Sequence, residues 1–477
     1  MTMAPPSAQG ALTRAASAAV EWAGNLQMAN ETELLAKYAA TLRYEDIPAD
    51  VVERAKQCIA DTIAVIIFGY DLPWSRMIVR FAETNAPGGN SRILGPGGAL
   101  VHAPAAALAN GTLAHAFEMD NLTWPSSGVH PGATLLAPAL AVAQARGIGG
   151  RELVTAVVAG GEVMIRIGRA TRHSNESRGF HAPGTTGPFG SAVACGRLLS
   201  LDAQRMRNAL GMAGSLACGL MEFARSGSGA MVKRLHLGRA AESGVLAASL
   251  AAEGFAAPAT AIEGEFGFLR VFCGSNFDRA ELTRGLGQSY AARSITLKRF
   301  PCHITAHTSV QAIVDLRAEY GYAPADVESI HIAGNEKMAG VNNIPSPSDI
   351  MMAQYSVPFC VALAHLRDPH DPRSFDETAL RDAQINALAH CVKITVAEEH
   401  PTPLAAAVSV ALRDGRVLTR TVTGFKGTPD RPLTQSELQD KFLMLTRHCG
   451  AQDMGRMFDR LQHIEHEANL DWIGVDA

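Results

Sequence analysis

Acidic, imidazole and hydroxyl side chains gather in one short stretch of the chain. His115, Glu118, Asp120, Thr123 and His130 follow one apolar segment and precede another. Acid–base catalysis requires such groups close together in a shielded place, where burial and neighbouring charges adjust their pKa values. A polar loop that caps two helices would show the same residues. The stretch therefore indicates either an active-site wall or an ordinary loop.

Cationic side chains stand in two further segments that are not surface-like. Lys233 and Arg234 are adjacent between small and apolar residues, and Lys298 stands shortly before His303. Cations among apolar residues are costly unless they are solvated or paired with an anion. A lysine beside a substrate carboxylate would stabilise the negative charge that develops when an α-proton is removed. An exposed Lys-Arg pair is the alternative interpretation of the first segment.

A glycine-rich segment, from Gly179 to Gly190, contains His181. Glycine lets the backbone approach a ligand closely, and a histidine can hydrogen-bond a carboxylate. The segment matches neither the G-x-G-x-x-G pattern nor a P-loop. A structural turn before a packed helix is the alternative interpretation.

The composition argues against several classes of protein. The 477 residues carry a net charge of −4 and no basic stripe that would bind nucleic-acid phosphates. None of the eight cysteines forms a C-x-x-C pair and no H-E-x-x-H motif is present, so we expect no metal and no other cofactor. The N-terminus lacks an apolar signal segment, and the apolar runs are shorter than the roughly 20 residues that cross a bilayer. We therefore expect a cytoplasmic protein without a membrane segment.

Hydrophobic periodicity divides the chain into helical and mixed regions. Apolar residues recur every three to four positions in 103–117, 152–170 and 240–253, whereas 329–332, 392–396, 408–412 and 417–422 alternate as strands do. Further helices are expected at about 306–320 and about 353–366. Thr434 and Glu437 form a capping-box pattern that predicts a return to helix.

These patterns predict a fold that is mostly α with an α+β lid. We expect an N-terminal arm at 1–29, the first part of a large all-helical domain at 30–293, and a smaller α+β lid domain at 294–430. The C-terminal helices at 431–477 are expected to rejoin the helical domain.

Taken together, the polar segments resemble the MmgE/PrpD family. This family includes 2-methylcitrate dehydratases, cis-aconitate decarboxylases and an iminodisuccinate epimerase. The resemblance spans about residue 32 to about residue 465, and its motifs are Glu53-Arg-Ala-Lys56, the loop from His115 to Pro131, Gly179-Phe-His181, Met231-Val-Lys233-Arg-Leu-His236 and Lys298-Arg-Phe-Pro-Cys-His303. It implies a homodimer with its pocket between the helical domain and the lid. It also implies that His130, His181, Lys233, Lys298 and His303 are site residues.

The first loop departs from the family pattern, which commonly reads His-x-x-Asp-x-Asp-Asp-Thr. Here Glu118 replaces the first aspartate, Asn121 replaces the third, and Leu122 looks inserted before Thr123. These changes leave the substrate and the role of Thr123 open.

The resemblance implies a small di- or tricarboxylate substrate and α-proton chemistry without a cofactor. We expect Lys233, Lys298 and His181 to bind carboxylates, with Thr123 and Arg234 as further substrate contacts.

The proton transfer is expected from His303 or His130, with Glu118 and Asp120 orienting His130. A 2-methylcitrate dehydratase-like hydro-lyase is the first expectation. The alternatives are a cis-aconitate decarboxylase-like carboxy-lyase, an iminodisuccinate epimerase and a non-catalytic carboxylate-binding protein.

Overall fold

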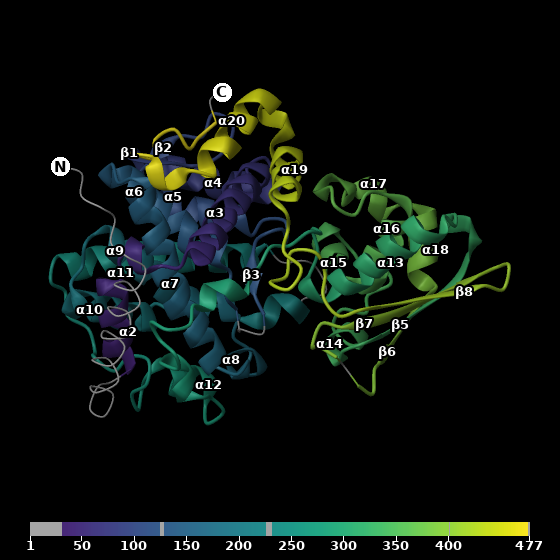
Figure 1. Ribbon diagram of the computed structural model, residues 1–477, viewed down its shortest axis with the longest axis horizontal. Coiled ribbons are helices and arrows are strands. Elements are labelled where there is room, and N and C mark those ends of the chain that lie inside the picture. Colours follow the sequence, from purple (N-terminus) through teal and green to yellow (C-terminus); the bar gives the residue numbers. More distant parts are fainter. Residues whose placement is uncertain (1–30, 125–127, 226–230, 400, 476–477) are drawn as a thin grey trace, which may run out of the picture.

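The protein is described by a computed structural model covering residues 31–124, 128–225, 231–399 and 401–475. The arm expected at 1–29 lies outside these residues. A large helical body and a smaller α+β part lie side by side along the longest axis (Figure 1). The fold is therefore mostly α with a smaller α+β part, as the periodicity predicts.

The helical body is built from long helices that pack closely on one another. Its elements are α2 (Glu31–Thr41), α3 (Ala49–Gly69), α4 (Pro73–Asn85), α5 (Ala103–Ala114), α6 (Ala137–Arg146), α7 (Gly150–Ala170), α8 (Ser174–Ser177), α9 (Ala182–Leu198), α10 (Ala203–Ser215), α11 (Val232–Ala252), α12 (Phe268–Cys273) and the short strands β1 (Pro87–Arg92) and β2 (Leu100–Val101).

Small residues let these helices approach. A Cβ atom on Gly187 of α9 would lie 2.8 Å from the Cβ atom of Ala240 on α11, and a Cβ atom on Gly238 of α11 would overlap the Leu108 carbonyl of α5. Larger side chains at these positions would force the helices apart.

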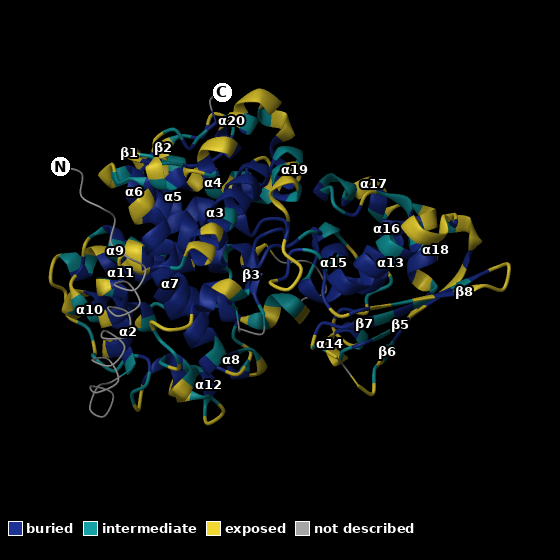
Figure 2. Ribbon diagram, in the orientation of Figure 1, coloured by how far each residue is buried: buried dark blue, intermediate teal, exposed yellow. Residues whose placement is uncertain are grey.

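The α+β part contains a four-stranded sheet in the order β6-β5-β7-β8, in which only β5 and β6 are parallel. Its apolar face packs against helices, while alternate residues on the other face reach solvent (Figure 2). The elements are α13 (His307–Tyr320), β5 (Val327–Gly334), α14 (Glu336–Ala339), α15 (Ile350–Tyr355), α16 (Val357–Leu366), α17 (Glu377–Leu380), α18 (Ala383–His390), β6 (Val392–Val396), β7 (Ala406–Leu412) and β8 (Val417–Val422).

Three of the expected helices have different bounds. The helix expected at 240–253 begins earlier, as α11, which runs from Val232 to Ala252. The helix expected at about 353–366 is broken into α15 and α16, because the Ser356 hydroxyl accepts a hydrogen bond from the Phe359 N–H as an N-cap and Pro358 stands in the first turn of α16. The helix expected at 103–117 ends at Ala114, since Glu118 adopts a positive φ of 58° shortly afterwards.

The chain ends in two helices, α19 (Gln435–Thr446) and α20 (Ala451–Leu461). The predicted capping box is present: the Thr434 hydroxyl accepts from the Glu437 N–H, and the Glu437 carboxylate accepts from the Thr434 N–H. Helix α19 contacts α3, so the last segment of the chain lies against the first long helix of the body (Figure 1).

No single described helix is both long and apolar enough to cross a membrane. Only α3 and α4 taken together pass on length and composition, and they are bent by 96° at their junction.

Candidate active site

Most of the residues predicted for the site surround one cavity of about 320 Å³ between the helical body and the α+β part. Seven of the nine predicted residues line it: Glu118, Thr123, His130, His181, Lys233, Lys298 and His303. Asp120 is buried behind the histidines, and Arg234 lies in the wall of a small adjoining pocket of about 30 Å³. Segments that are far apart in sequence thus meet at one place.

A short antiparallel ladder brings the first loop to the Lys298 segment. Strand β3 (Leu122–Thr123) pairs with β4 (Ile295–Thr296), with Leu122 opposite Thr296. Leu122, which looks inserted relative to the family pattern, therefore forms part of this ladder. Thr123 lines the cavity, and its buried hydroxyl has no hydrogen-bond partner among the described residues, so it is available to a ligand.

Two polar side chains from distant elements hold the first loop and the Lys298 segment in place. The Gln354 side-chain amide on α15 donates to the Phe117 carbonyl and the Pro301 carbonyl, at 2.9 Å each. Lys441 Nζ on α19 donates to the Lys298 carbonyl at 2.7 Å and to Asp61 at 2.5 Å. Both the α+β part and the C-terminal helix therefore shape the site.

Glu118 binds both predicted lysines. One carboxylate oxygen contacts Lys233 Nζ and the other lies 3.0 Å from Lys298 Nζ, and all three side chains are at most 5% exposed. Burial opposes ionisation of Glu118, but the two lysines outweigh it and hold its pKa well below the usual range. Burial lowers the pKa of Lys233 to about 8, whereas Glu118 and Asp120 outweigh burial at Lys298 and raise its pKa.

The backbone of Glu118 is in the left-handed region, which is uncommon for residues other than glycine. Such strain is retained where the surrounding structure requires it, and it is frequent at functional sites. Here it turns the carboxylate toward the lysines.

Asp120 holds two histidines at once. Its oxygens lie 2.9 Å from His115 Nδ1 and 2.7 Å from His130 Nδ1. The pKa of Asp120 is lowered well below its usual range because the two imidazoles outweigh the effect of burial, so it is an anion that accepts both Nδ1–H bonds. Each histidine then carries its lone pair on Nε2. His130 lines the cavity with the atom that can accept or deliver a proton.

The His115, Asp120 and His130 ligand atoms lie within 4.8 Å of one another, a spacing that a metal ion could bridge. The hydrogen bonds to Asp120 already satisfy both Nδ1 atoms. These hydrogen bonds to Asp120 therefore account for the geometry of this cluster.

His303 is oriented by a chain of neutral groups. The Asn342 amide donates to the Tyr355 carbonyl, so its oxygen accepts from the Thr305 hydroxyl at 3.1 Å. His303 Nδ1 lies 2.8 Å from that hydroxyl and accepts a hydrogen bond from the Thr305 N–H at 3.4 Å. Burial, followed by the nearby charge of Lys337, lowers the pKa of His303 well below its usual value. His303 is therefore a neutral group in the cavity wall.

His181 has a histidine partner that the sequence analysis did not assign to the site. Its Nδ1 lies 2.9 Å from Nδ1 of His236, so a proton is shared between the two rings. Burial, reinforced by Lys233, lowers both pKa values. His181 enters the site as a neutral group.

The glycine-rich segment leads into a packed helix, which is the second of the two interpretations open from the sequence. From Ala182 it forms the first turns of α9, and His181 precedes the helix. A Cβ atom on Gly190 would lie 2.8 Å from the Met164 Cβ atom, and Gly187 faces α11 in the same way. These glycines allow helix packing, because larger residues would not fit between the helices.

Several cavity residues were not predicted, including Tyr355, Lys337, Trp124 and Glu176. Tyr355 packs its ring 4.8 Å from Lys233 Nζ and 4.8 Å from the His303 ring. No motif near Tyr355 or Lys337 indicates chemistry, so only the fold brings them to the cavity. Gly229 and Ala230, which precede the Lys233 motif, lie outside the described residues.

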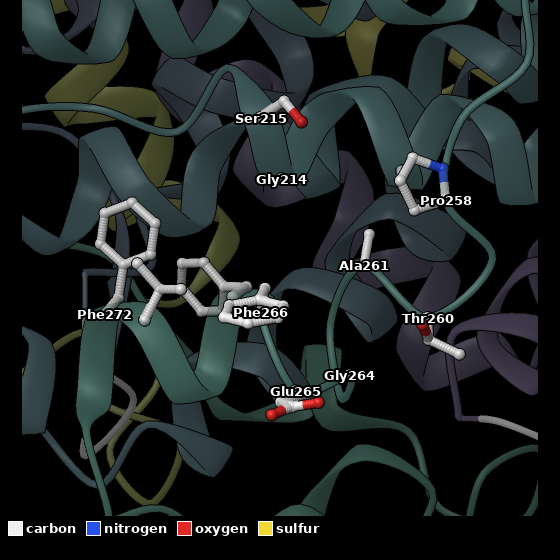
Figure 3. A pocket seen from close by; sticks show the side chains of 13 residues that line it. Gly214, Ser215, Pro258, Thr260, Ala261, Gly264, Glu265, Phe266 and Phe272 are labelled. Carbon is white, nitrogen blue, oxygen red and sulfur yellow. The ribbon is translucent and has the colours of Figure 1, made fainter.

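A second cavity, of about 450 Å³, lies in the helical body beside α10 and α12 (Figure 3). Glycines, hydroxyl residues, Pro258 and phenylalanines line it, and Glu265 is its one ionisable side chain among the described residues. It lacks the groups that acid–base chemistry requires, which places the candidate active site at the first cavity.

Comparison with known proteins gives matches along most of the chain. A cis-aconitate decarboxylase of Aspergillus terreus is 34% identical over 302 residues, which cover 61% of this chain and 60% of that protein. A cis-aconitate decarboxylase of Homo sapiens is 27% identical over 426 residues, 86% of each chain. The match to the fungal relative thus spans about three fifths of that protein's length. The MmgE/PrpD N-terminal domain matches residues 33–280 and the MmgE/PrpD C-terminal domain matches residues 300–464, so the chain belongs to the MmgE/PrpD family.

Proposed function

We propose that this protein is a cofactor-independent carboxy-lyase that acts on a small tricarboxylate of the cis-aconitate type. The observation that carries the proposal is the buried Lys233–Glu118–Lys298 cluster, which faces the cavity together with neutral His303 and Asp120-bound His130. The dehydratase expected first becomes the alternative, because the curated relatives reported above are cis-aconitate decarboxylases.

The cavity wall suits a polyanion. Lys233, Lys298 and Lys337 line it, so a ligand with three carboxylates meets three cations. The Thr123 hydroxyl and neutral His181 add hydrogen-bonding groups. Burial strengthens these interactions because the dielectric constant is low there.

Decarboxylation of such a substrate proceeds with a shift of its double bond. The bond between the methylene carbon and its carboxylate breaks, and the released electron pair forms a new carbon–carbon double bond. The electron pair of the original double bond then takes a proton at the carbon beside another carboxylate. cis-Aconitate and a proton thus yield carbon dioxide and 2-methylenebutanedioate. Negative charge passes onto the second carboxylate during the reaction, and lysines beside it stabilise that charge.

His130 and His303, the two histidines expected to transfer protons, differ in their fitness to deliver this one. His130 faces the Asp120 carboxylate, which stabilises an imidazolium ion. His303 instead rests on the neutral Thr305 hydroxyl near three lysines, which disfavour its charged form. We therefore assign proton delivery to His130.

The experiment is an NMR comparison of cis-aconitate, 2-methylcitrate, citrate and iminodisuccinate in deuterated water. We expect carbon dioxide and singly deuterated 2-methylenebutanedioate from cis-aconitate. Loss of water from 2-methylcitrate without decarboxylation of cis-aconitate would establish the hydro-lyase instead. No reaction and no exchange across the panel would leave a carboxylate-binding protein.

The assembly is proposed on the family resemblance, and the location on the expectation from the sequence. We propose a homodimer in the cytoplasm. Light scattering of the purified protein and fractionation of cells that produce it check these two points.

A further inference from the structure

Two buried groups beside the cavity face each other without a proton between them. His115 Nε2 lies 3.6 Å from Glu118 Oε1, and neither side chain is more than 2% exposed. His115 Nδ1 donates to Asp120, so Nε2 presents a lone pair. It has no hydrogen-bond partner among the described residues. A lone pair and a carboxylate oxygen thus meet in a buried place, where unpaired acceptors are costly.

Contacts with two lysines account for this arrangement. Lys233 and Lys298 donate to the Glu118 carboxylate and keep it ionised. Burial, with a contribution from Lys233, lowers the pKa of His115 to about 4, although Asp120 and Glu118 act in the opposite direction. The lysines therefore satisfy Glu118, and His115 stays neutral.

We propose that His115 and Glu118 take up a proton from solvent when a carboxylate ligand occupies Lys233 and Lys298. The proposal rests on the carboxylate site of the proposed function but requires no turnover. The ligand draws lysine N–H donors away from Glu118 and adds a negative charge beside it. Both changes favour a new N–H bond on His115 Nε2 that donates to Glu118 Oε1.

The proton completes a buried chain of charge-assisted hydrogen bonds. Glu118, His115, Asp120 and His130 are joined in that order, by contacts of 3.6 Å, 2.9 Å and 2.7 Å. A carboxylate bound at Lys233 and Lys298 thereby changes the charge beside Asp120, and this in turn changes the electrostatic environment of His130. His115 does not line the cavity, so it is a positioning residue that acts through Asp120 and Glu118.

The charged and titratable groups that surround His115 lie on several different elements. They are Glu118 and Asp120 on its own loop, Lys233 on α11, Lys298 in the segment after β4, His181 before α9, and His130, whose ring lies 4.9 Å from that of His115 between centroids.

The test measures proton uptake on binding of propane-1,2,3-tricarboxylate, which has no double bond and does not undergo the proposed reaction. Calorimetric titrations near pH 7 in HEPES and in Tris give the protons bound, since the two buffers differ in ionisation enthalpy. We expect net uptake in the wild-type protein. His115→Asn keeps a donor for Asp120 but removes Nε2. Glu118→Gln places an amide N–H opposite Nε2. Both variants should lose most of the uptake.

A matched control is His365→Asn in α16. His365 is also buried, its pKa is also lowered to about 4 by burial, and it donates to the Val361 carbonyl, away from the cavity. This variant should take up as many protons as the wild-type protein. It separates the proposed pair from a general effect of replacing a buried histidine.

The outcomes are distinct. Unchanged uptake in His115→Asn and Glu118→Gln, or no uptake by the wild-type protein, overturns the proposal. The proposal is also overturned if none of the three ligands propane-1,2,3-tricarboxylate, succinate and malonate binds. If His115→Asn does not fold, Glu118→Gln carries the test. Turnover of cis-aconitate is a separate assay, so a protein that takes up the proton but does not decarboxylate refutes only the proposed function.

Discussion

Asp120 Oδ2 lies 2.7 Å from His130 Nδ1, and this contact fixes which nitrogen of His130 reaches the cavity. The carboxylate is fully buried and also accepts from His115, so it cannot turn away without leaving two donors unpaired. The orientation of the proton-transferring histidine is therefore set by a residue that does not itself line the cavity.

Asp120→Asn should lower kcat more than it changes KM. The amide nitrogen can donate a hydrogen bond, so His130 would be held in the other tautomer and its imidazolium form would lose the facing anion. A loss of about 10²- to 10⁴-fold in kcat is expected from the cost of such tautomer changes in other enzymes. Steady-state kinetics on the substrate found by NMR check this. An unchanged kcat in a folded variant would remove His130 from proton transfer.

Lys298→Met should destabilise the fold, because Glu118 would keep its buried charge with one cation fewer. Removing one partner of a buried ion pair costs about 3–5 kcal/mol. Urea denaturation measures the free energy of unfolding. The double variant Lys298→Met with Glu118→Gln is the control, since it removes both charges and should recover most of the loss. Equal stability of the single and double variants would contradict the assigned pairing.

Ligand affinity should fall as the pH rises through about 8, where Lys233 loses its charge. The protonated amine binds an anion better than the neutral amine, so the dissociation constant for propane-1,2,3-tricarboxylate should show a further rise above this pH, in addition to the shallower increase that proton uptake by His115 and Glu118 gives below it. Calorimetric titration across the range checks the sign. Lys233→Arg stays charged throughout and should not show this rise, whatever its absolute affinity. A rise at the same pH in Lys233→Arg would assign the titration to another group.

Chelation should leave activity unchanged. The His115–Asp120–His130 cluster has ligand atoms at a spacing that suits a metal ion, yet hydrogen bonds to Asp120 account for its geometry. Dialysis against EDTA followed by an activity assay, with metal analysis of the same sample, checks this. Loss of activity that Zn²⁺ or Mn²⁺ restores would show a metal centre instead.

The sequence predicts the parts of the site that carry motifs. His303 and Lys233 stand in family motifs, and both line the cavity. It misses Tyr355, because nothing around a lone tyrosine at the end of a short helix indicates that the fold turns its ring toward Lys233. It also cannot show that Gln354 ties two loops together, because both of its acceptors are backbone carbonyls.

The repeat of apolar residues along the sequence predicts the fold class, because a helix or a strand that buries one face must carry apolar residues at its own period. It misses the break between α15 and α16, where local capping by Ser356 overrides a continuous apolar pattern. The glycines after His181 were open to two interpretations from sequence. Only the positions of α7 and α11 show that helix packing requires them.

Asn121→Asp should destabilise the protein, although it restores the acid that the family commonly has there. The Asn121 amide nitrogen donates to Asp61 Oδ2 at 3.1 Å and to the Thr62 hydroxyl at 2.9 Å, and its oxygen accepts from the Gly132 N–H at 2.8 Å. A carboxylate there would lose these donated hydrogen bonds, and a further one to the Cys58 carbonyl, and would face the Asp61 carboxylate. Each unsatisfied buried group costs about 1–3 kcal/mol.

The loss should grow with pH. Burial already raises the pKa of Asp61, with Lys441 opposing, and a second carboxylate would raise it further. A carboxyl group whose pKa is higher in the folded state than in the unfolded state is protonated more easily in the fold, so its stabilising contribution is lost as the pH rises through the folded-state value. Urea denaturation at acidic and at neutral pH, with Asn121→Ala as the uncharged control, measures this. A deficit in Asn121→Asp that is equal at both pH values, or no larger than that of Asn121→Ala at neutral pH, would show that repulsion from Asp61 is not its cause.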